Sequence, residues 1–160
     1  MTRGPWTITE GSGPLVAAAI HHGHELRAEV ARRMLLSDED RLREEDPYTG
    51  DWTDVAPTRV VVHRSRFEVD LNRPRESCVY AGPEEAWGLD LWRGPLSPAL
   101  RARSLALWDA FHLALAALIE RRLADVDRVL VLDLHSYNHR RSGPGAAPDP
   151  SEGNPEINLG

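Results

Sequence analysis

The chain has 160 residues, of which 41% are hydrophobic and 28% charged, a composition typical of one folded domain with a buried core. The net charge of −6 at pH 7 argues against a general attraction to nucleic acid or to an anionic membrane. The sequence contains no lysine, which excludes Schiff-base chemistry, and a single cysteine, which excludes an internal disulfide framework. No signal-peptide pattern and no apolar run of about 18 residues is found, so we expect a cytoplasmic protein with no membrane partner.

The first predicted elements lie in the N-terminal quarter of the chain. Residues 14–20, PLVAAAI, form a short apolar run that ends in the polar stretch HHGHE, which predicts a buried strand followed by a loop. Leu26, Val30 and Met34 follow at steps of four and predict one face of a helix. Ser37 then precedes three acidic residues, the pattern of a helix N-terminus with its capping side chain.

The rest of the chain alternates between strand and helix patterns. Residues 46–52 are rich in turn formers, and residues 58–74 contain β-branched runs that predict one or two strands. Ser97 followed by proline marks the start of a long amphipathic helix that reaches residue 124, and residues 128–134 predict a closing strand. We therefore expect an α/β fold of three layers, α/β/α, with a mixed and partly parallel sheet.

The last residues differ in composition from the residues before them. Residues 140–155 are dense in glycine, proline and serine and predict a mobile or lid-like loop. Residues 156–160, EINLG, have the pattern of a strand that begins there. We therefore expect a single domain over residues 1–160 that is incomplete at its C-terminal end.

Histidines and acids follow two of the predicted strands. The strand over 14–20 leads into a group of histidines with one glutamate, and the strand over 128–134 leads to His135. Because the carboxyl ends of parallel strands meet at one edge of a sheet, we expect these side chains to lie close together. Imidazole nitrogens at such an edge suit a zinc ion. The candidates in the first group are His21, His22, His24 and Glu25.

Residues near these groups suggest supporting roles. Asp133 lies two residues before His135 on the same face of the strand, and we expect it to orient the imidazole. The stretch VDLNRP places Asn72 and Arg73 together, and a guanidinium can hold a substrate carboxylate with two hydrogen bonds. An α/β protein with an accidental histidine cluster is the alternative to this interpretation.

Four stretches together resemble the N-formylglutamate amidohydrolase family. The most specific are SRFEVDLNRPRESCVY (65–80) and LDLHS (132–136), and the others are IHHGHELR (20–27) and LREEDPYTG (42–50). The resemblance covers the chain from residue 14 to residue 160. Because that family is similar in fold to the zinc carboxypeptidases, the resemblance implies a hydrolase-like, zinc carboxypeptidase-like fold.

The resemblance also implies a set of zinc ligands. His21 matches the first ligand of the family, in the pattern histidine, any residue, glycine, and His135 matches the last. The position three residues after the first ligand, usually a glutamate, is His24 here, and we take His24 as the second ligand. Pairing His22 with Glu25 instead gives the spacing of the aspartoacylase-like branch, and this alternative stays open.

Other roles follow from the resemblance. Glu45 and Asp46, from the acidic turn, are further candidates for a zinc ligand or for a residue that supports one. Asn72 and Arg73 would hold the substrate carboxylate, with Ser136 as a further substrate contact. The family's general base is a glutamate beyond the NLG stretch, so we expect it to lie outside this chain.

The resulting hypothesis is a zinc-dependent amidohydrolase that cleaves a linear amide C–N bond. Its expected substrate is an N-acyl acidic amino acid such as N-formyl-L-glutamate, and we expect this small molecule, but neither nucleic acid nor a membrane, as a partner. The alternative is a carboxylate-binding relative, or a fragment, without turnover. Hydrolysis of N-acyl amino acids by the zinc-loaded protein distinguishes the two.

Overall fold

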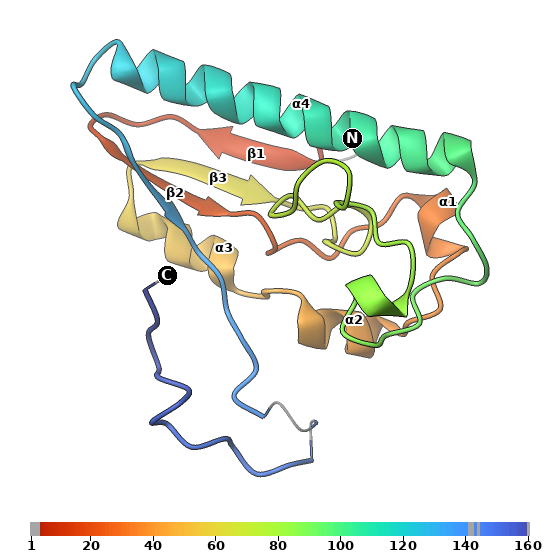
Figure 1. The fold of residues 1–160 in the computed structure, drawn as a ribbon. Coiled ribbons are helices and arrows are strands. Elements are labelled where there is room, and N and C mark those ends of the chain that lie inside the picture. The colour runs from red at the N-terminus through yellow and green to blue at the C-terminus, as the bar shows by residue number, and fades with distance from the viewer. Residues whose placement is uncertain (1–3, 141–142, 144, 160) are drawn as a thin grey trace.

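A four-stranded sheet lies at the centre of the computed structural model, which describes residues 4–140, 143 and 145–159 (Figure 1). In the order in which they pair, the strands are β1 (Trp6–Thr9), β3 (Thr58–Val62), β2 (Leu15–Ala19) and β4 (Leu130–Asp133). β1 is antiparallel to β3, whereas β2 is parallel to both β3 and β4. The mixed, partly parallel sheet is thereby confirmed, as are the strands predicted at 14–20 and 128–134.

The edge strand β1 is the one strand that the sequence did not predict. It has only four residues, which alternate between half-buried and exposed, and it pairs Trp6 with Val62. The indole of Trp6 packs edge-on against Phe111, with 5.5 Å between the ring centroids. A short strand of this kind has too few residues for its alternation to stand out in a sequence.

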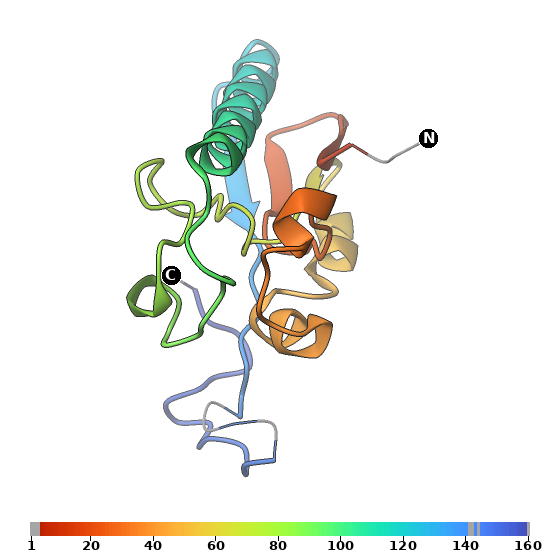
Figure 2. The same ribbon diagram turned by 90° about the vertical axis from the view of Figure 1, so that its right-hand side faces the viewer.

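The long helix α4 (Pro98–Leu123) lies along one face of the sheet, as Figures 1 and 2 show. Ser97 caps it, because its hydroxyl oxygen accepts a hydrogen bond from the backbone N–H of Leu100. Phe111 and Leu118 are buried in the main hydrophobic cluster together with residues of β2 and β3. The predicted helix and its N-terminal signal are confirmed.

Length and composition alone would also let α4 cross a membrane. It has 26 residues, contains an 18-residue stretch with a mean hydropathy of 1.3, and is the one such helix in the part of the chain that the structure describes. A helix that packs along a sheet passes the same test, so α4 is weak evidence of a membrane protein.

Short helices lie on the other side of the sheet from α4 (Figure 2). The helix α3 (Thr49–Trp52) and the 3₁₀ helix η1 (Thr53–Val55) contact β2, four of whose five residues are buried. The helix α2 (Asp38–Glu44) begins after Ser37, whose hydroxyl oxygen accepts a hydrogen bond from the N–H of Asp40, as its capping pattern predicts. Helical segments therefore cover both faces, whereas the zinc carboxypeptidase-like arrangement of layers stays a prediction.

The helix predicted through Leu26 and Met34 is wrong in its length. Only α1 (Ala28–Ala31) is helical, and Met34 instead forms an isolated β-bridge with Trp92. Leu26 and Met34 both pack in a second hydrophobic cluster around Phe67. Val30 and Met34 are thus buried as expected and Leu26 is partly buried, but a bridge to a distant segment follows the helix after one turn.

The prediction of strands through residue 74 is also wrong beyond β3, which ends at Val62. The segment that follows is a loop in which Phe67 and Val69 are buried and the alternating acids Glu68 and Asp70 are equally buried. The N–H of Asp70 donates to the carbonyl oxygen of Cys78 at 2.7 Å rather than to a strand. Ion pairs of the two carboxylates, described below, hold this loop in place of a sheet ladder.

The end of the chain also differs from the prediction. No strand forms over residues 156–159, and Ile157 and Leu159 are 81% and 93% exposed, because no neighbouring strand pairs with this segment. The loop predicted over 140–155 is irregular in its described residues, while residues 141, 142, 144 and 160 lie outside them. The strand prediction is therefore wrong over residues 156–159, whereas the loop is confirmed as irregular and its mobile or lid-like character stays a prediction.

Candidate metal centre and adjoining pocket

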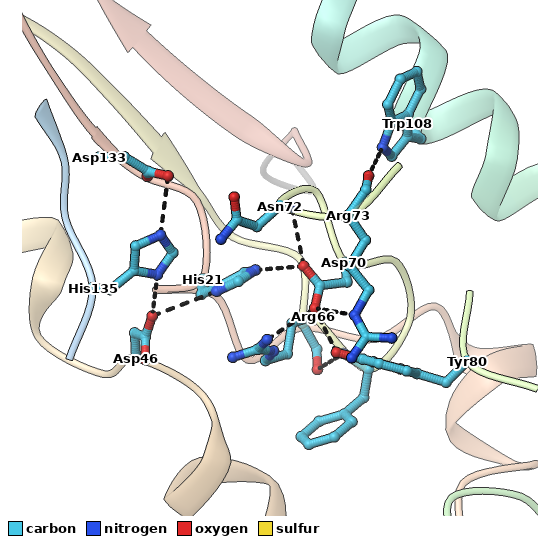
Figure 3. A network of polar contacts seen from close by, with 12 residues as sticks. His21, Asp46, Arg66, Asp70, Asn72, Arg73, Tyr80, Trp108, Asp133 and His135 are labelled. Carbon is cyan, nitrogen blue, oxygen red and sulfur yellow. Dashed lines mark hydrogen bonds and ion pairs between the residues drawn. The ribbon is translucent and has the colours of Figure 1, made fainter. Parts of the chain in front are cut away.

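Three side chains from distant parts of the sequence meet beyond the C-terminal ends of the parallel strands β2 and β4 (Figure 3). His21 follows β2, His135 follows β4, and Asp46 lies directly beyond the C-terminal cap of α2. The parallel pairing of β2 with β4 brings the two histidines together, with 4.9 Å between their ring centroids. The backbone N–H of Asp46 donates to the carbonyl oxygen of His21 at 3.0 Å, which holds the acid beside them.

The three side chains form a group that could bind a metal ion. One ligand atom from each lies within 4.8 Å of the others, and no other set of histidine, cysteine, aspartate or glutamate in the described residues does so. Asp46 Oδ2 is 2.7 Å from His135 Nδ1 and 3.5 Å from His21 Nδ1. Two imidazoles and a carboxylate are the donors that catalytic zinc sites use. We name His21, Asp46 and His135 the His21 cluster.

His21 shows which of its nitrogens is available to a metal. Its Nε2 donates to Asp70 Oδ1 at 2.7 Å, so this nitrogen carries a proton. Its Nδ1 is buried and has no hydrogen-bond partner, which is rare for a buried polar atom. In neutral His21 the Nδ1 lone pair faces the Asp46 carboxylate, and a cation between these two electron donors would stabilise the arrangement. The residues therefore fit a metal ion.

His135 lies between two carboxylates. Its Nε2 is 3.0 Å from Asp133 Oδ2, and its Nδ1 is 2.7 Å from Asp46. Hydrogen bonds to Asp133 and Asp46 raise the pKa of His135 to about 9 despite its partial burial. Burial opposes ionisation of Asp46, but the hydrogen bond from His135 and the nearby His21 outweigh it and lower the pKa of Asp46 to about 2. The site is thus electrostatically arranged for a positive charge between these acids.

Asp70 contacts the cluster through His21 and also accepts hydrogen bonds from three residues outside it. It accepts hydrogen bonds from Arg66 at 2.8 Å, from the hydroxyl of Tyr80 at 2.5 Å and from the backbone N–H of Asn72 at 3.0 Å. Burial opposes the charge on Asp70, but the hydrogen bond from His21 and its other partners lower the pKa well below its usual range. The carboxylate therefore stays ionised and orients His21.

The two predicted substrate anchors differ in their surroundings: Asn72 is exposed, whereas the Arg73 guanidinium already has partners within the protein. The guanidinium of Arg73 donates to the backbone carbonyl of Glu85 at 2.8 Å and lies over the ring of Tyr80 at 4.5 Å. Arg73 Nε is 3.6 Å from Asp70, and neither Arg73 nor Asn72 lines the pocket described below. Ser136 does line that pocket, and its hydroxyl donates to Asp46 at 3.3 Å. The roles predicted for these three residues stay predictions.

His24 does not join His21 and His135, although it was predicted to bind metal with them. Its Nδ1 bonds to Glu45, and Arg41 donates to its Nε2 at 3.0 Å. The chain from His21 to His24 is not helical, so a spacing of three does not place both rings on one side. A Cβ on Gly23 would lie 2.1 Å from the carbonyl carbon of His63, which shows how closely this segment packs against the backbone just beyond the end of β3.

The alternative ligands also lie outside the group, with one exception. His22 Nδ1 accepts a hydrogen bond from the N–H of Gly50 at 3.1 Å, and Glu25 pairs through its backbone with Arg64. Glu45 bonds to His24 and to Ser65. The exception is Asp46, which the structure places within the His21 cluster.

A pocket of about 550 Å³ opens beside the cluster. Asp46 and Ser136 line it on the side of the cluster. Arg66, whose guanidinium forms an ion pair with Asp70, lines it as well. Sequence reasoning missed Arg66, although it lies in the same stretch as Asn72 and Arg73, and missed Trp87, for which the sequence offers no signal. The remaining lining residues are Leu42, Arg43, Glu44, Glu45, Pro47, Leu89, Tyr137 and Asn138.

Comparisons with known proteins identify the family of the chain and a structure of similar fold. The fold matches the crystal structure of an N-formylglutamate amidohydrolase from Ralstonia eutropha JMP134 with a TM-score of 0.73 and 19% sequence identity. The match covers 85% of this chain and 59% of the other, so the chain spans little more than half of that structure. A search among curated proteins gave no match. The family model for N-formylglutamate amidohydrolase matches residues 13–160, and the chain therefore belongs to the N-formylglutamate amidohydrolase family.

Proposed function

We propose that the chain is a zinc-dependent amidohydrolase that removes an N-acyl group, formyl in particular, from an acidic amino acid such as N-formyl-L-glutamate. The observation that carries the proposal is the His21 cluster, in which a buried imidazole nitrogen without a hydrogen-bond partner faces a carboxylate beside a pocket. Membership of the amidohydrolase family supports the reaction type.

The donor set supports zinc as the metal. His21 Nδ1, Asp46 and His135 would supply two nitrogens and one oxygen, and three protein ligands are the number that leaves a catalytic zinc ion one open position. When bound, zinc supplies a Lewis acid that polarises the amide carbonyl and makes water a stronger nucleophile near neutral pH. Asp70 and Asp133 would hold the two imidazoles in orientation.

The pocket supports an anionic substrate. Arg66 lines it with a guanidinium that donates to Asp70 at 2.8 Å and to the backbone carbonyl of Glu44 at 3.4 Å, and a guanidinium is a planar group suited to a carboxylate. Asn72 and Arg73 remain proposed carboxylate contacts. Both lie beside Asp70, to which the backbone N–H of Asn72 donates and from which Arg73 Nε is 3.6 Å away. Ser136, beside Asp46, would contact the amide group.

We also propose a cytoplasmic location and a place in the zinc carboxypeptidase-like and aspartoacylase-like superfamily. The single cysteine, Cys78, is buried, and burial raises the pKa of its thiol to about 11, as suits a cysteine that serves packing rather than redox chemistry. The superfamily placement rests on the mixed sheet with histidines at the carboxyl edge of two parallel strands.

Zinc titration combined with a hydrolysis assay tests the function. Protein purified without a histidine tag is stripped with a chelator and titrated with zinc, and glutamate release from N-formyl-L-glutamate is then measured. We expect one zinc ion per chain and turnover only in the loaded protein. Asp46→Ala should lose both properties, whereas Asp51→Ala, which changes an exposed acid outside the pocket, should keep both.

The outcomes separate the proposal from its alternative. A protein that takes up no zinc contradicts the metal site. A protein that binds zinc and N-formyl-L-glutamate, but releases no glutamate under any condition, is a carboxylate-binding relative, or a fragment, without turnover.

A further inference from the structure

Trp87 stands out among the residues of the pocket because its conformation and its exposure are both unfavourable. Its φ angle is 54°, in the left-handed region that favours glycine, and its side chain is 57% exposed. A bulky residue in this region costs conformational free energy, and such residues concentrate at functional sites. An exposed indole also leaves a large apolar surface in contact with water.

The backbone around Trp87 is held firmly, so the exposure is not that of a loose loop end. Ala86 is fully buried, and the N–H of Gly88 donates to the carbonyl oxygen of Pro83 at 2.8 Å. The N–H of Leu89 donates to the carbonyl oxygen of Ala86 at 2.9 Å, which closes a tight turn. This turn presents the indole at the pocket.

Two arginines and a tyrosine set the position of the ring. The guanidinium carbon of Arg66 is 4.8 Å from the centroid of the Trp87 ring, and that of Arg73 is 5.9 Å away. The ring of Tyr80 lies 6.0 Å away. Contacts between cations and the ring face favour this position, and they place the indole next to the guanidinium that lines the pocket.

The pocket therefore offers an apolar wall beside a cation. Trp87, Leu42 and Leu89 line it together with Arg66, and the same pocket reaches Asp46 of the His21 cluster. Small-molecule sites combine apolar walls with a few placed polar groups in this way. A ligand with a carboxylate and a hydrocarbon part matches both features.

We propose that Trp87 is a substrate-binding residue whose indole packs against the hydrocarbon part of an N-acyl amino acid while Arg66 faces its carboxylate. The inference rests on the proposed function for the identity of the ligand. It adds a residue for which the sequence offers no signal. The exposed apolar surface is then covered when the substrate binds, and this gain offsets the unfavourable backbone conformation.

Binding of N-formyl-L-glutamate and N-formyl-L-leucine to the metal-stripped protein tests the inference without turnover. Isothermal titration calorimetry gives the dissociation constants, and tryptophan fluorescence reports contact with an indole. We expect Trp87→Ala to weaken binding of both ligands about 10-fold, the effect of losing one contact in an apolar pocket. Trp52→Ala is the matched control, because Trp52 is 48% exposed and does not line the pocket.

Two further variants keep the test independent of folding. Trp87→Gly suits the left-handed φ, so it should keep the thermal midpoint of the wild type while weakening the binding. Trp87→Phe keeps an aromatic wall, so it should bind nearly as tightly as wild type but lose the fluorescence change that the ligands cause. Trp52→Ala should keep that change.

The results distinguish this inference from the proposed function. Binding that depends on Trp87 in a protein that never hydrolyses the ligands, even with zinc, supports the inference and contradicts the function. Hydrolysis with a KM that Trp87→Ala leaves unchanged supports the function and overturns the inference. Unchanged ligand affinity in Trp87→Ala, or absence of any ligand binding, also overturns it.

Discussion

Glu45 and Asp46 are neighbours in the sequence, yet they belong to two clusters with different chemistry. Glu45 lies with His24, Arg41 and Ser65, which we name the His24 cluster, and Asp46 lies in the His21 cluster. Both clusters pair a buried acid with histidine. They differ in whether an arginine is present and in whether every imidazole nitrogen has a partner.

In the His24 cluster the charges and hydrogen bonds are balanced within the protein. Arg41 contacts Glu45 at 3.3 Å, and both nitrogens of His24 have partners. In the His21 cluster no arginine contacts Asp46 among the described residues, and His21 Nδ1 has no hydrogen-bond partner. The comparison indicates that a histidine and acid cluster neutralised by arginine serves stability, whereas one without arginine is available to a cation.

The largest expected effect is on stability, in the His24 cluster. Glu45→Ala leaves Arg41, which is 4% exposed, without its buried carboxylate, and breaking a buried pair costs about 3–5 kcal/mol. Urea unfolding measures the loss. Glu44→Ala is the control, because its carboxylate is about one third exposed and should matter little. A loss equal to that of the control would contradict the structural role of this cluster.

The next effect is on zinc affinity and separates the two clusters directly. His21→Ala removes one of three ligands, so zinc affinity should fall by more than about 100-fold, beyond the loss caused by removing a supporting residue. His24→Ala should leave the affinity unchanged. Competition with a chelating dye measures both. If His24→Ala weakened zinc binding as much as His21→Ala, the prediction of His24 as a ligand would stand and the comparison would fail.

A smaller effect is expected from the residue that orients His21. Asp70→Asn removes the charge that accepts the Nε2 proton, so zinc affinity should fall about 10-fold, within the range for residues that support a ligand. Glu68→Gln is the matched control, because Glu68 is an equally buried acid that bonds to Arg27 instead. Equal losses in both variants would show a general effect of buried charge rather than orientation of His21.

The smallest effect is the pH dependence of stability in the metal-stripped protein. The pKa of His135 rises from its ordinary 6.5 to about 9 because of Asp133 and Asp46, so folding favours the protonated ring. This contribution is complete below pH 6.5 and is lost as the pH rises through 9. Thermal midpoints with chelator should therefore fall over that window, and His135→Gln should flatten the decline. A wild-type midpoint that stayed constant would contradict the pairing of His135 with the two acids.

The sequence alone determined the elements whose signals are local. The apolar run of β2, the capping serine and periodicity of α4, and the strand before His135 are readable because burial and capping act within a few neighbouring residues. The same reasoning placed His21 and His135 at one edge of the sheet, because parallel strands align their ends.

Only the tertiary structure decided which residues complete the sites. Asp46, rather than His24, joins the histidines, because the chain after β2 is not helical and α2 returns the acid to His21 from 25 positions later in the sequence. Arg66 lines the pocket because a loop held by buried ion pairs replaces the expected strand, and Trp87 reaches the same pocket from the separate turn over residues 86–89. Such contacts depend on where distant segments meet in space, and the spacing of residues along one segment carries no record of that meeting.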